Sequence, residues 1–359
     1  MISLYFHIPF CTQKCPYCHF YVIPNQAPLR KLLGEGLALE WQQVWPRIQG
    51  KPVASIYFGG GTPSLFGPEG IGPLLERIPR DADCEITLEA NPEECSYELL
   101  KSFSDLGINR ISFGVQSLDN RSLTELGRLH SAEKAKQAVL EAERAGFKNI
   151  SIDLMFDLPD QTEESWRYTL AQVKELPIQH VSLYNLTVEP HTLFFKRGVQ
   201  PLGGERSLKL LSLGVEKLEE LGFVRYEISA FAKPGYASRH NTGYWTGRPF
   251  WGYGPSAFSF WEGERFRNHA NLQRYVRALR EGLSPVDFRE KLAPQESAHE
   301  LLAIGLRRLE GVDWNTVPQT ALGSIAQLKK EGLLTVKEGK LRLTERGLLL
   351  YDTVATELV

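Results

Sequence analysis

Residues 5–20 read YFHIPFCTQKCPYCHF, in which an apolar, strand-like run leads directly into Cys11, Cys15 and Cys18. The three cysteines have the spacing C-x3-C-x2-C, so their thiolates lie on one short loop. Three such thiolates can hold three irons of a cubane 4Fe–4S cluster, which normally has four Cys thiolate ligands. Because no fourth cysteine follows nearby, the fourth iron needs a ligand from outside the protein.

S-adenosylmethionine (SAM) can provide that ligand through its amino and carboxylate groups, and this cysteine spacing is the usual one in radical SAM enzymes. A zinc site is one alternative, but structural zinc needs four ligands, usually in two separated pairs, and we expect His19 to point away from the loop. Free structural cysteines are another alternative, although three so close together would be an unusual coincidence. The spacing therefore predicts a 4Fe–4S cluster that binds SAM.

The composition is that of a soluble protein from a reducing compartment. The chain has 359 residues, 42% of them hydrophobic and 23% charged, which allows one large domain and a smaller one. Five cysteines give no disulfide framework, and Cys84 and Cys95 are expected to be buried and inert. The net charge of −2 argues against a nucleic-acid surface. We expect a cytoplasmic protein with no signal peptide and no integral membrane segment.

Apolar, β-branched runs alternate along the chain with stretches of helical periodicity. Strands are expected over residues 4–8, 53–58, 85–90, 110–115, 150–156 and 180–185. Helices are expected over residues 28–45, 69–78, 96–106, 131–145, 163–175 and 205–221. Strands that are each followed by a helix form parallel neighbours joined by right-handed crossovers. The pattern predicts an α/β fold with a partial (β/α)6 radical SAM barrel.

Polar residues stand at the carboxyl ends of these strands, where such barrels place their chemistry. They are Gly60, Gly61, Thr62, Glu89, Gln116, Asp153, Asn185 and Thr187. An ionised group within an apolar strand is costly unless it is paired, so one such residue could be the structural partner of an arginine. Several that converge on one mouth instead predict a binding site.

Glycines 59–61 follow the second expected strand. A triple glycine lets the backbone approach a ligand closely and expose its N–H groups, although alone it could be a tight turn. The run lacks the Lys-Ser/Thr ending of a phosphate-binding loop and does not match a dinucleotide fingerprint. Beside a SAM-binding cluster, it is interpreted as a cradle for the amino group of the methionyl moiety.

Seven segments together resemble the oxygen-independent coproporphyrinogen III oxidase superfamily. They are the run at 5–20, GGGTPS at 59–64, EANPE at 89–93, GVQS at 114–117, LGRLH at 126–130, DLMFDLP at 153–159 and LTVEP at 186–190. The resemblance points to the heme chaperone (HemW) branch for two reasons. The oxidase carries a fourth Cys two positions after the third, where this chain has Phe20, and HemW-like chains share an HNxxYW motif, found here at residues 240–245.

The resemblance implies a role for each matching residue. The cluster ligands would be Cys11, Cys15 and Cys18. The SAM contacts would be Tyr5 and Tyr17 at its flanks, Gly60, Gly61 and Thr62 at the methionyl end, and Glu89, Gln116, Arg128 and Asp153 at the ribose and carboxylate. The heme contacts would be His240, Asn241, Tyr244 and Trp245. A bidentate arginine clamp on a carboxylate is a chemically sensible role for Arg128.

His240 also has a structural interpretation, because a lone histidine is more often a surface or hydrogen-bonded core residue than a ligand. Aromatic residues crowd the sequence after it, at Tyr244, Trp245, Trp251, Tyr253 and Phe258. Such surroundings suit axial ligation and apolar cover of a porphyrin. The same aromatics could instead seal the core of the barrel, and the sequence leaves both interpretations open.

The end of the chain resembles a small winged-helix-type unit. Helices are expected over residues 295–309, 320–331 and 345–358, with a hairpin over 333–336 and 340–343 that turns at Gly339. Winged helices often bind DNA, but six Lys or Arg against five Asp or Glu from Thr320 onward are too balanced for a phosphate footprint. We therefore interpret this C-terminal unit as a lid or docking module on the barrel and not as a DNA-binding domain. The expected domains are a radical SAM core over 1–225, a connecting segment with the HNxxYW motif over 226–290, and a HemN/HemW-type C-terminal domain over 291–359.

The function implied by the resemblance is a heme-binding chaperone with a SAM-coordinated 4Fe–4S cluster. It would transfer heme to an acceptor protein, such as a respiratory one, and would lack coproporphyrinogen oxidase activity. An oxygen-independent coproporphyrinogen III oxidase-type radical SAM enzyme is the alternative. A nucleic-acid modifier is the third class, against which the charge argues.

Overall fold

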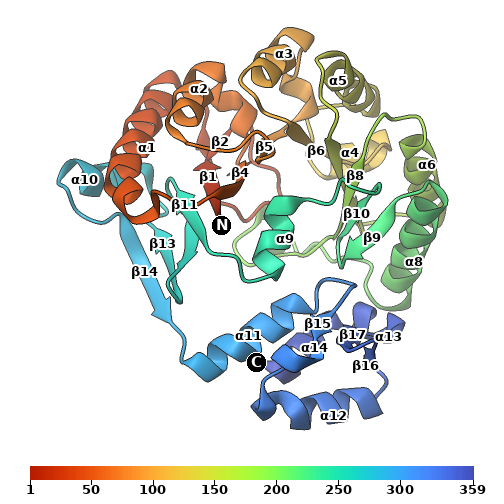
Figure 1. The fold of residues 1–359 in the computed structure, drawn as a ribbon. Coiled ribbons are helices and arrows are strands. Elements are labelled where there is room, and N and C mark those ends of the chain that lie inside the picture. Colours follow the sequence, from red (N-terminus) through yellow and green to blue (C-terminus); the bar gives the residue numbers. More distant parts are fainter.

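The computed structural model describes all 359 residues, and Figure 1 shows an arc of helices around a central sheet. The parallel strands lie in chain order as β1 (Ile2–Ile8), β4 (Val53–Gly60), β5 (Glu85–Ala90), β6 (Arg110–Gln116), β7 (Ile150–Phe156) and β8 (His180–Asn185). The covering helices are α1 (Ala27–Ile48), α2 (Pro68–Arg77), α3 (Tyr97–Asp105), α5 (Ala132–Arg144), α6 (Glu163–Val173) and α8 (Gly204–Glu220). This arrangement confirms the predicted partial barrel.

Side-chain caps explain why several helices begin where the sequence predicts. Ser96, Ser131 and Thr162 precede α3, α5 and α6, and each side chain accepts a hydrogen bond from the backbone N–H three residues later. Such a cap satisfies one of the N–H groups that the first turn of a helix leaves free. The start of each of these helices therefore lies within one residue of its predicted start.

The parallel strands alternate between apolar and polar residues, and this period of two separates two environments. The apolar side chains, such as Leu4, Phe58 and Ile152, pack with the helices in a core of 62 buried residues. The alternate positions hold hydroxyls, imidazoles and charged groups, namely Ser3, Tyr5, His7, Ser55, Tyr57, Glu85, Thr87, Glu89, Arg110, Ser112, Ser151, Asp153, His180 and Ser182. Closed eight-unit barrels fill their interior with bulky branched residues, whereas this interior is polar.

Short strands extend the sheet at both edges. Beyond β8 lie β10 (Ala230–Ala232) and β9 (Val224–Glu227), and beyond β1 lie β11 (Phe250–Tyr253), β12 (Phe258–Trp261), β13 (Glu264–Asn268) and β14 (Val286–Lys291). β11 runs parallel to β1, and the other added strands pair antiparallel with their neighbours. Residues 226–290, expected to connect the domains and to carry the HNxxYW motif, thus also supply strands to both edges of the barrel sheet.

A short helix, α9 (Arg239–Trp245), carries the HNxxYW motif and lies across the centre of the barrel (Figure 1). The backbone N–H groups of Arg239 and His240 each donate to the carboxylate of Glu85 at 2.9 Å. Glu85 is the first residue of β5, so α9 sits at the amino-terminal end of the strands. The cluster loop follows the carboxyl end of β1, at the opposite end of the barrel.

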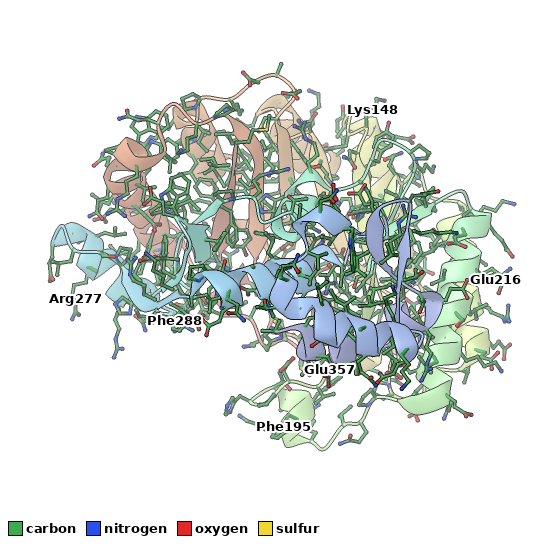
Figure 2. All side chains as sticks on the ribbon, turned by 60° about the horizontal axis from the view of Figure 1, so that its bottom comes forward. Lys148, Phe195, Glu216, Arg277, Phe288 and Glu357 are labelled. Atoms are coloured by element: carbon green, nitrogen blue, oxygen red, sulfur yellow. The ribbon has the colours of Figure 1, made fainter.

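The C-terminal unit has a separate core of 12 buried residues. Its elements are α11 (Pro294–Gly305), α12 (Leu322–Lys330), α13 (Glu345–Leu349), α14 (Tyr351–Leu358) and a sheet of β15 (Val312–Asp313), β17 (Lys340–Leu343) and β16 (Leu334–Lys337). This order confirms the predicted α+β unit, but the structure adds β15 and divides the last expected helix into two at Leu350. In Figure 2 its helices lie in front of the barrel, and α11 packs against α9. None of the helices in the chain combines the length and apolar composition needed to cross a membrane.

The guanidinium of Arg307 joins the C-terminal unit to the barrel. It lies 4.4 Å from the ring centre of Trp245 on α9 and 5.1 Å from that of Tyr351 on α14. Its Nη2 atom lies 3.5 Å from a carboxylate oxygen of Glu227 on β9. A cation between two aromatic rings is attracted by both ring faces. One arginine therefore links the last residue of the HNxxYW motif to the end of the chain.

Candidate functional site

A cavity of about 430 Å³ lies at the carboxyl end of the barrel strands. It is lined by all the predicted cluster and SAM residues except Tyr5, namely Cys11, Cys15, Tyr17, Cys18, Gly60, Gly61, Thr62, Glu89, Gln116, Arg128 and Asp153. The structure thus brings together residues from β4, β5, β6 and β7, from the cysteine loop and from the loops at residues 61–62 and 128. The sequence predicted that polar residues converge on one mouth of the barrel, and the lining of this cavity agrees with that prediction.

The three cysteines line the cavity. The Sγ atom of Cys11 lies 3.6 Å from Thr62 Oγ1, and that of Cys15 lies 3.4 Å from Arg128 Nη1. Burial raises the pKa of Cys11 to about 11 and also raises that of Cys18, so metal binding must displace their protons. No three His, Cys, Asp or Glu side chains converge as the ligands of a single ion would. Three thiols around a shared space fit a cluster better than one zinc ion.

His19 differs from its expected position. It lines the cavity beside Cys18 instead of pointing away from it. The reason is local: the N–H of Cys18 bonds to the carbonyl of Cys15 at 3.1 Å, and this turn ends the strand-like geometry on which the expectation rested.

Arg128 stands between the cluster loop and β6. Its Nη2 atom donates to Asn91 Oδ1 at 2.6 Å and to the carbonyl of Gly114 at 2.8 Å. Its Nε atom is buried and has no partner. A buried guanidinium donor without an acceptor is costly, which fits a ligand with a carboxylate. This orphaned donor is the observation in the site that best fits the methionyl carboxylate of SAM.

Two half-buried carboxylates, Glu89 and Asp153, line the cavity. Glu89 accepts hydrogen bonds from Tyr57 Oη at 2.6 Å and from the N–H of Gly60 at 3.2 Å. Burial raises the pKa of Glu89 to about 7 and that of Asp153 to about 6. Both groups therefore titrate near neutral pH and can accept a proton or a hydrogen bond from an amino or hydroxyl group.

The glycine run lines the cavity, but its N–H groups are not exposed. Those of Gly61 and Thr62 donate to the carbonyls of Ile8 and Phe10 at 2.9 and 2.6 Å, and that of Gly60 bonds to Glu89. A Cβ on Gly61 would lie 2.5 Å from the oxygen of Phe10, so close backbone packing requires glycine there. These N–H groups are therefore not available to cradle a ligand, contrary to the expectation from the sequence.

Gln116 has a strained backbone at the end of β6. Its φ is +66°, in the left-handed region that non-glycine residues rarely adopt, and the β6–β7 register shifts just before it. Strain of this kind persists where the surrounding structure holds it and is concentrated at functional sites. The shift turns the Gln116 side chain into the cavity.

Further cavity residues were not predicted as ligands: Asn91, Ser112, Gly114, Met155, Tyr184 and Glu189. Signals for five of them were present in the sequence. Asn91, Gly114, Met155 and Glu189 lie inside the motifs that carry the resemblance, and Ser112 precedes Gly114 and Gln116 with the strand period of two.

Tyr5 lies in the barrel interior and not at the cavity wall. Its hydroxyl is 3.2 Å from His7 Nδ1, and its ring stacks on Tyr57 with the centres 6.1 Å apart. Tyr17 does line the cavity, against Phe194. Of the two tyrosines expected to flank SAM, the structure places only Tyr17 where it can do so directly.

The HNxxYW residues lie apart from this cavity. His240 Nδ1 is 2.9 Å from Ser55 Oγ, its Nε2 is 2.9 Å from Tyr244 Oη, and the residue is 1% exposed. Burial lowers the pKa of His240 to about 3, so the ring is neutral. Both ring nitrogens are engaged, and a bond to a heme iron requires another arrangement of α9. The heme role of His240, Asn241, Tyr244 and Trp245 stays a prediction. Of the aromatics that follow them, Trp251 and Tyr253 pack in the core of the barrel, whereas Phe258 is exposed.

Comparisons with known proteins agree with this geometry. Residues 5–173 match the model of the radical SAM superfamily, and residues 292–350 match that of the HemN C-terminal domain. Heme chaperone HemW of Bacillus subtilis is 32% identical over 99% of this chain and 98% of its own length. HemW of Lactococcus lactis is 35% identical over 86% of this chain and 82% of its own length.

The solved structure of coproporphyrinogen III oxidase (HemN) from Escherichia coli, described as a radical SAM enzyme, superposes with a TM-score of 0.86. The two chains are 25% identical, and the match covers 99% of this chain and 89% of that one. The shared fold extends over barrel and C-terminal domain alike. With HemW relatives similar along nearly the whole chain, the protein belongs to the heme chaperone HemW family of the radical SAM superfamily.

Proposed function

We propose that this protein is a heme-binding chaperone that carries a SAM-coordinated 4Fe–4S cluster and passes heme to an acceptor protein in the cytoplasm. The observation that carries the proposal is the similarity to HemW chaperones, which spans nearly the full length of both chains. In this proposal the acceptor is another protein, for example a respiratory protein, to which the chaperone passes its heme. The proposed division of the chain is a barrel core in residues 1–225, a connecting segment in 226–290 and a C-terminal domain in 291–359.

The cavity residues support the cofactor part of the proposal. Cys11, Cys15 and Cys18 would hold the cluster, which supplies an electron and an open iron site when it is bound. Arg128 would bind the methionyl carboxylate through its unpaired Nε donor. Glu89 and Asp153 would accept hydrogen bonds from amino or ribose hydroxyl groups, while Gly60, Gly61, Thr62, Gln116 and Tyr17 shape the walls.

A coproporphyrinogen III oxidase-type enzyme is the second candidate, favoured by the structural similarity to HemN. The position at which the oxidase resemblance calls for a fourth cysteine is occupied by Phe20. Its side chain is 53% exposed at the cavity mouth and has no group that can bind a metal or transfer a proton. This substitution favours the chaperone over the oxidase.

The deciding experiment uses the full chain after anaerobic reconstitution of the cluster. We expect the protein to bind heme and to release it to a heme-free acceptor. Incubation with coproporphyrinogen III, SAM and a reductant should yield no protoporphyrinogen IX. Oxidase product formed in amounts that depend on the cluster would favour the second candidate.

A further inference from the structure

A heme iron needs a ring nitrogen with a free lone pair, so the partners of every histidine bear on where heme binds. In five of the eight histidines both ring nitrogens have hydrogen-bond partners: His7, His130, His180, His240 and His299. His269 pairs with Asp287 through Nδ1 at 3.4 Å. Only His19 and His191 have no partner on either nitrogen, and only His19 lines the cluster cavity.

The surroundings of His19 suit a flat apolar ligand. Its ring packs against that of Phe20, with the ring centres 4.6 Å apart, and Phe20 remains 53% exposed. Val22 lines the same part of the cavity. An exposed aromatic ring beside a free imidazole at a cavity mouth provides an apolar face and an axial nitrogen together.

A cation completes this arrangement. Lys14 lines the cavity, and its ammonium donates to the carbonyl of Phe20 at 3.1 Å. It forms no ion pair, and an ammonium has three donors, so two remain for another acceptor. Heme carries two propionate carboxylates at one edge. Lys14 therefore provides charge complementarity close to the histidine and the phenylalanine.

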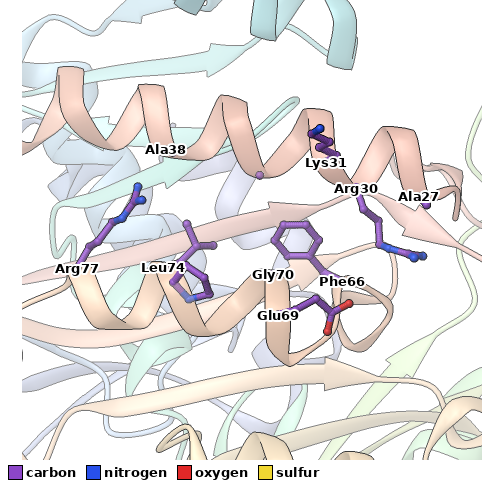
Figure 3. Close-up of a pocket in the computed structure, with 11 residues that line it drawn as sticks. Ala27, Arg30, Lys31, Ala38, Phe66, Glu69, Gly70, Leu74 and Arg77 are labelled. Carbon is purple, nitrogen blue, oxygen red and sulfur yellow. The ribbon is translucent and has the colours of Figure 1, made fainter.

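The other large cavity lacks such a set. It measures about 440 Å³ and lies between α1 and α2 on the outside of the barrel, where Phe66 points toward α1 (Figure 3). Arg30, Lys31 and Arg77 give it a basic rim. Its walls contain no His, Cys, Met or Tyr side chain, the usual axial ligands of heme iron.

We propose that His19 is the axial ligand of the heme iron, with Phe20 against the porphyrin face and Lys14 on a propionate. This inference rests on the proposed heme-binding function and assigns its site to the mouth of the cluster cavity. His19 follows Cys18 directly, so the bound heme lies next to the cluster loop. The HNxxYW motif then supports the barrel from its far end without touching the iron.

The test is a titration of ferric heme into the full chain with its cluster reconstituted. Matched preparations carry His19→Ala, Lys14→Gln or the control His191→Gln, which removes the other unpartnered imidazole. We expect His19→Ala to shift the Soret band and to lower the affinity by at least about tenfold. Lys14→Gln should weaken binding without moving the Soret band. His191→Gln should change neither.

Two further measurements guard against indirect effects. Iron and sulfide content verify that His19→Ala keeps its cluster, and added imidazole should restore the histidine-type Soret band of that variant. If His19→Ala loses the cluster, the heme affinity and Soret band of His19→Asn and Lys14→Gln are compared with those of the wild type instead. If the wild type binds heme and cluster-loaded His19→Ala shows an unchanged Soret band, the assignment of His19 is wrong but the proposed heme-binding function stands. Failure of the wild type to bind heme overturns the proposed function as well.

Discussion

The Nη1 atom of Arg128 lies 3.4 Å from the Sγ atom of Cys15, so a buried positive charge stands beside one of the three cavity thiols. The same guanidinium holds Asn91 and Gly114 and keeps one buried donor free. Arg128 therefore connects the cluster loop with the part of the cavity expected to take a carboxylate.

Replacing Cys11, Cys15 and Cys18 together by Ala should abolish the cluster and leave the fold intact. The reason is that none of the three belongs to the core of 62 residues between sheet and helices. Reconstituted wild type should contain close to four irons and four sulfides per chain. Iron analysis and far-ultraviolet circular dichroism check this, and undiminished iron in the triple variant would refute the cluster assignment.

Arg128→Ala and Asp153→Ala should each weaken SAM binding by about 1.5–3 kcal/mol, the usual range for a lost hydrogen bond to a charged group. Equilibrium binding to the reconstituted protein measures the effect. Arg121→Ala is the matched control, because this arginine is exposed on α4 (Asn120–Glu125) and pairs only with Glu125. Equal affinities in all four proteins would remove both residues from the SAM site.

Much of the fold was predictable because its signals are local. The central strands and their helices show periods of two and 3.6, and their caps lie within three residues of the groups they satisfy. β9 and β10 have only four and three residues, too few to show a period, and edge pairing alone defines them. The partners of His240 could not be predicted either, since Ser55 lies 185 residues away in the sequence.

The cavity was predicted better than the atoms that do the binding. Residue types at strand ends identify its walls, but the direction of a backbone N–H depends on packing that a sequence does not display. The glycine run is an example, because the N–H of Gly61 bonds to the carbonyl of Ile8 at the end of β1 and that of Gly60 bonds to Glu89. The two ring nitrogens of His19 are a second example, because a sequence does not show that a side chain will have no hydrogen-bond partner.

Glu89→Gln should flatten the pH dependence of stability. Burial raises the pKa of Glu89 from 4.5 to about 7, so between these values the folded protein keeps a proton that the unfolded chain releases. This contribution to the free energy of unfolding is complete below pH 4.5 and is lost as the pH rises through 7, by roughly 3 kcal/mol. Urea unfolding of the cluster-free protein between pH 5 and 8 measures it.

Glu76→Gln, an exposed glutamate on α2, provides the control for this titration. The free energy of unfolding of this control should depend on pH in the same way as that of the wild type. A Glu89→Gln curve that also ran parallel would mean that Glu89 does not titrate in this range.

His240→Ala should destabilise the fold by about 2–4 kcal/mol, because it leaves a buried cavity and removes the partner of Ser55 and Tyr244. Thr246→Ala, exposed just after the same helix, should cost far less. Urea unfolding compares the two. A stability loss no greater than that of the control would show that α9 does not depend on this imidazole to close the barrel.

The central claim is that this chain carries heme and does not oxidise coproporphyrinogen III. The most direct measurement gives one cluster-loaded preparation both ferric heme and coproporphyrinogen III with SAM and reductant, and follows the Soret band and the porphyrin products. We expect a saturable heme complex and no protoporphyrinogen IX. Turnover to protoporphyrinogen IX, or no heme complex at all, would contradict it.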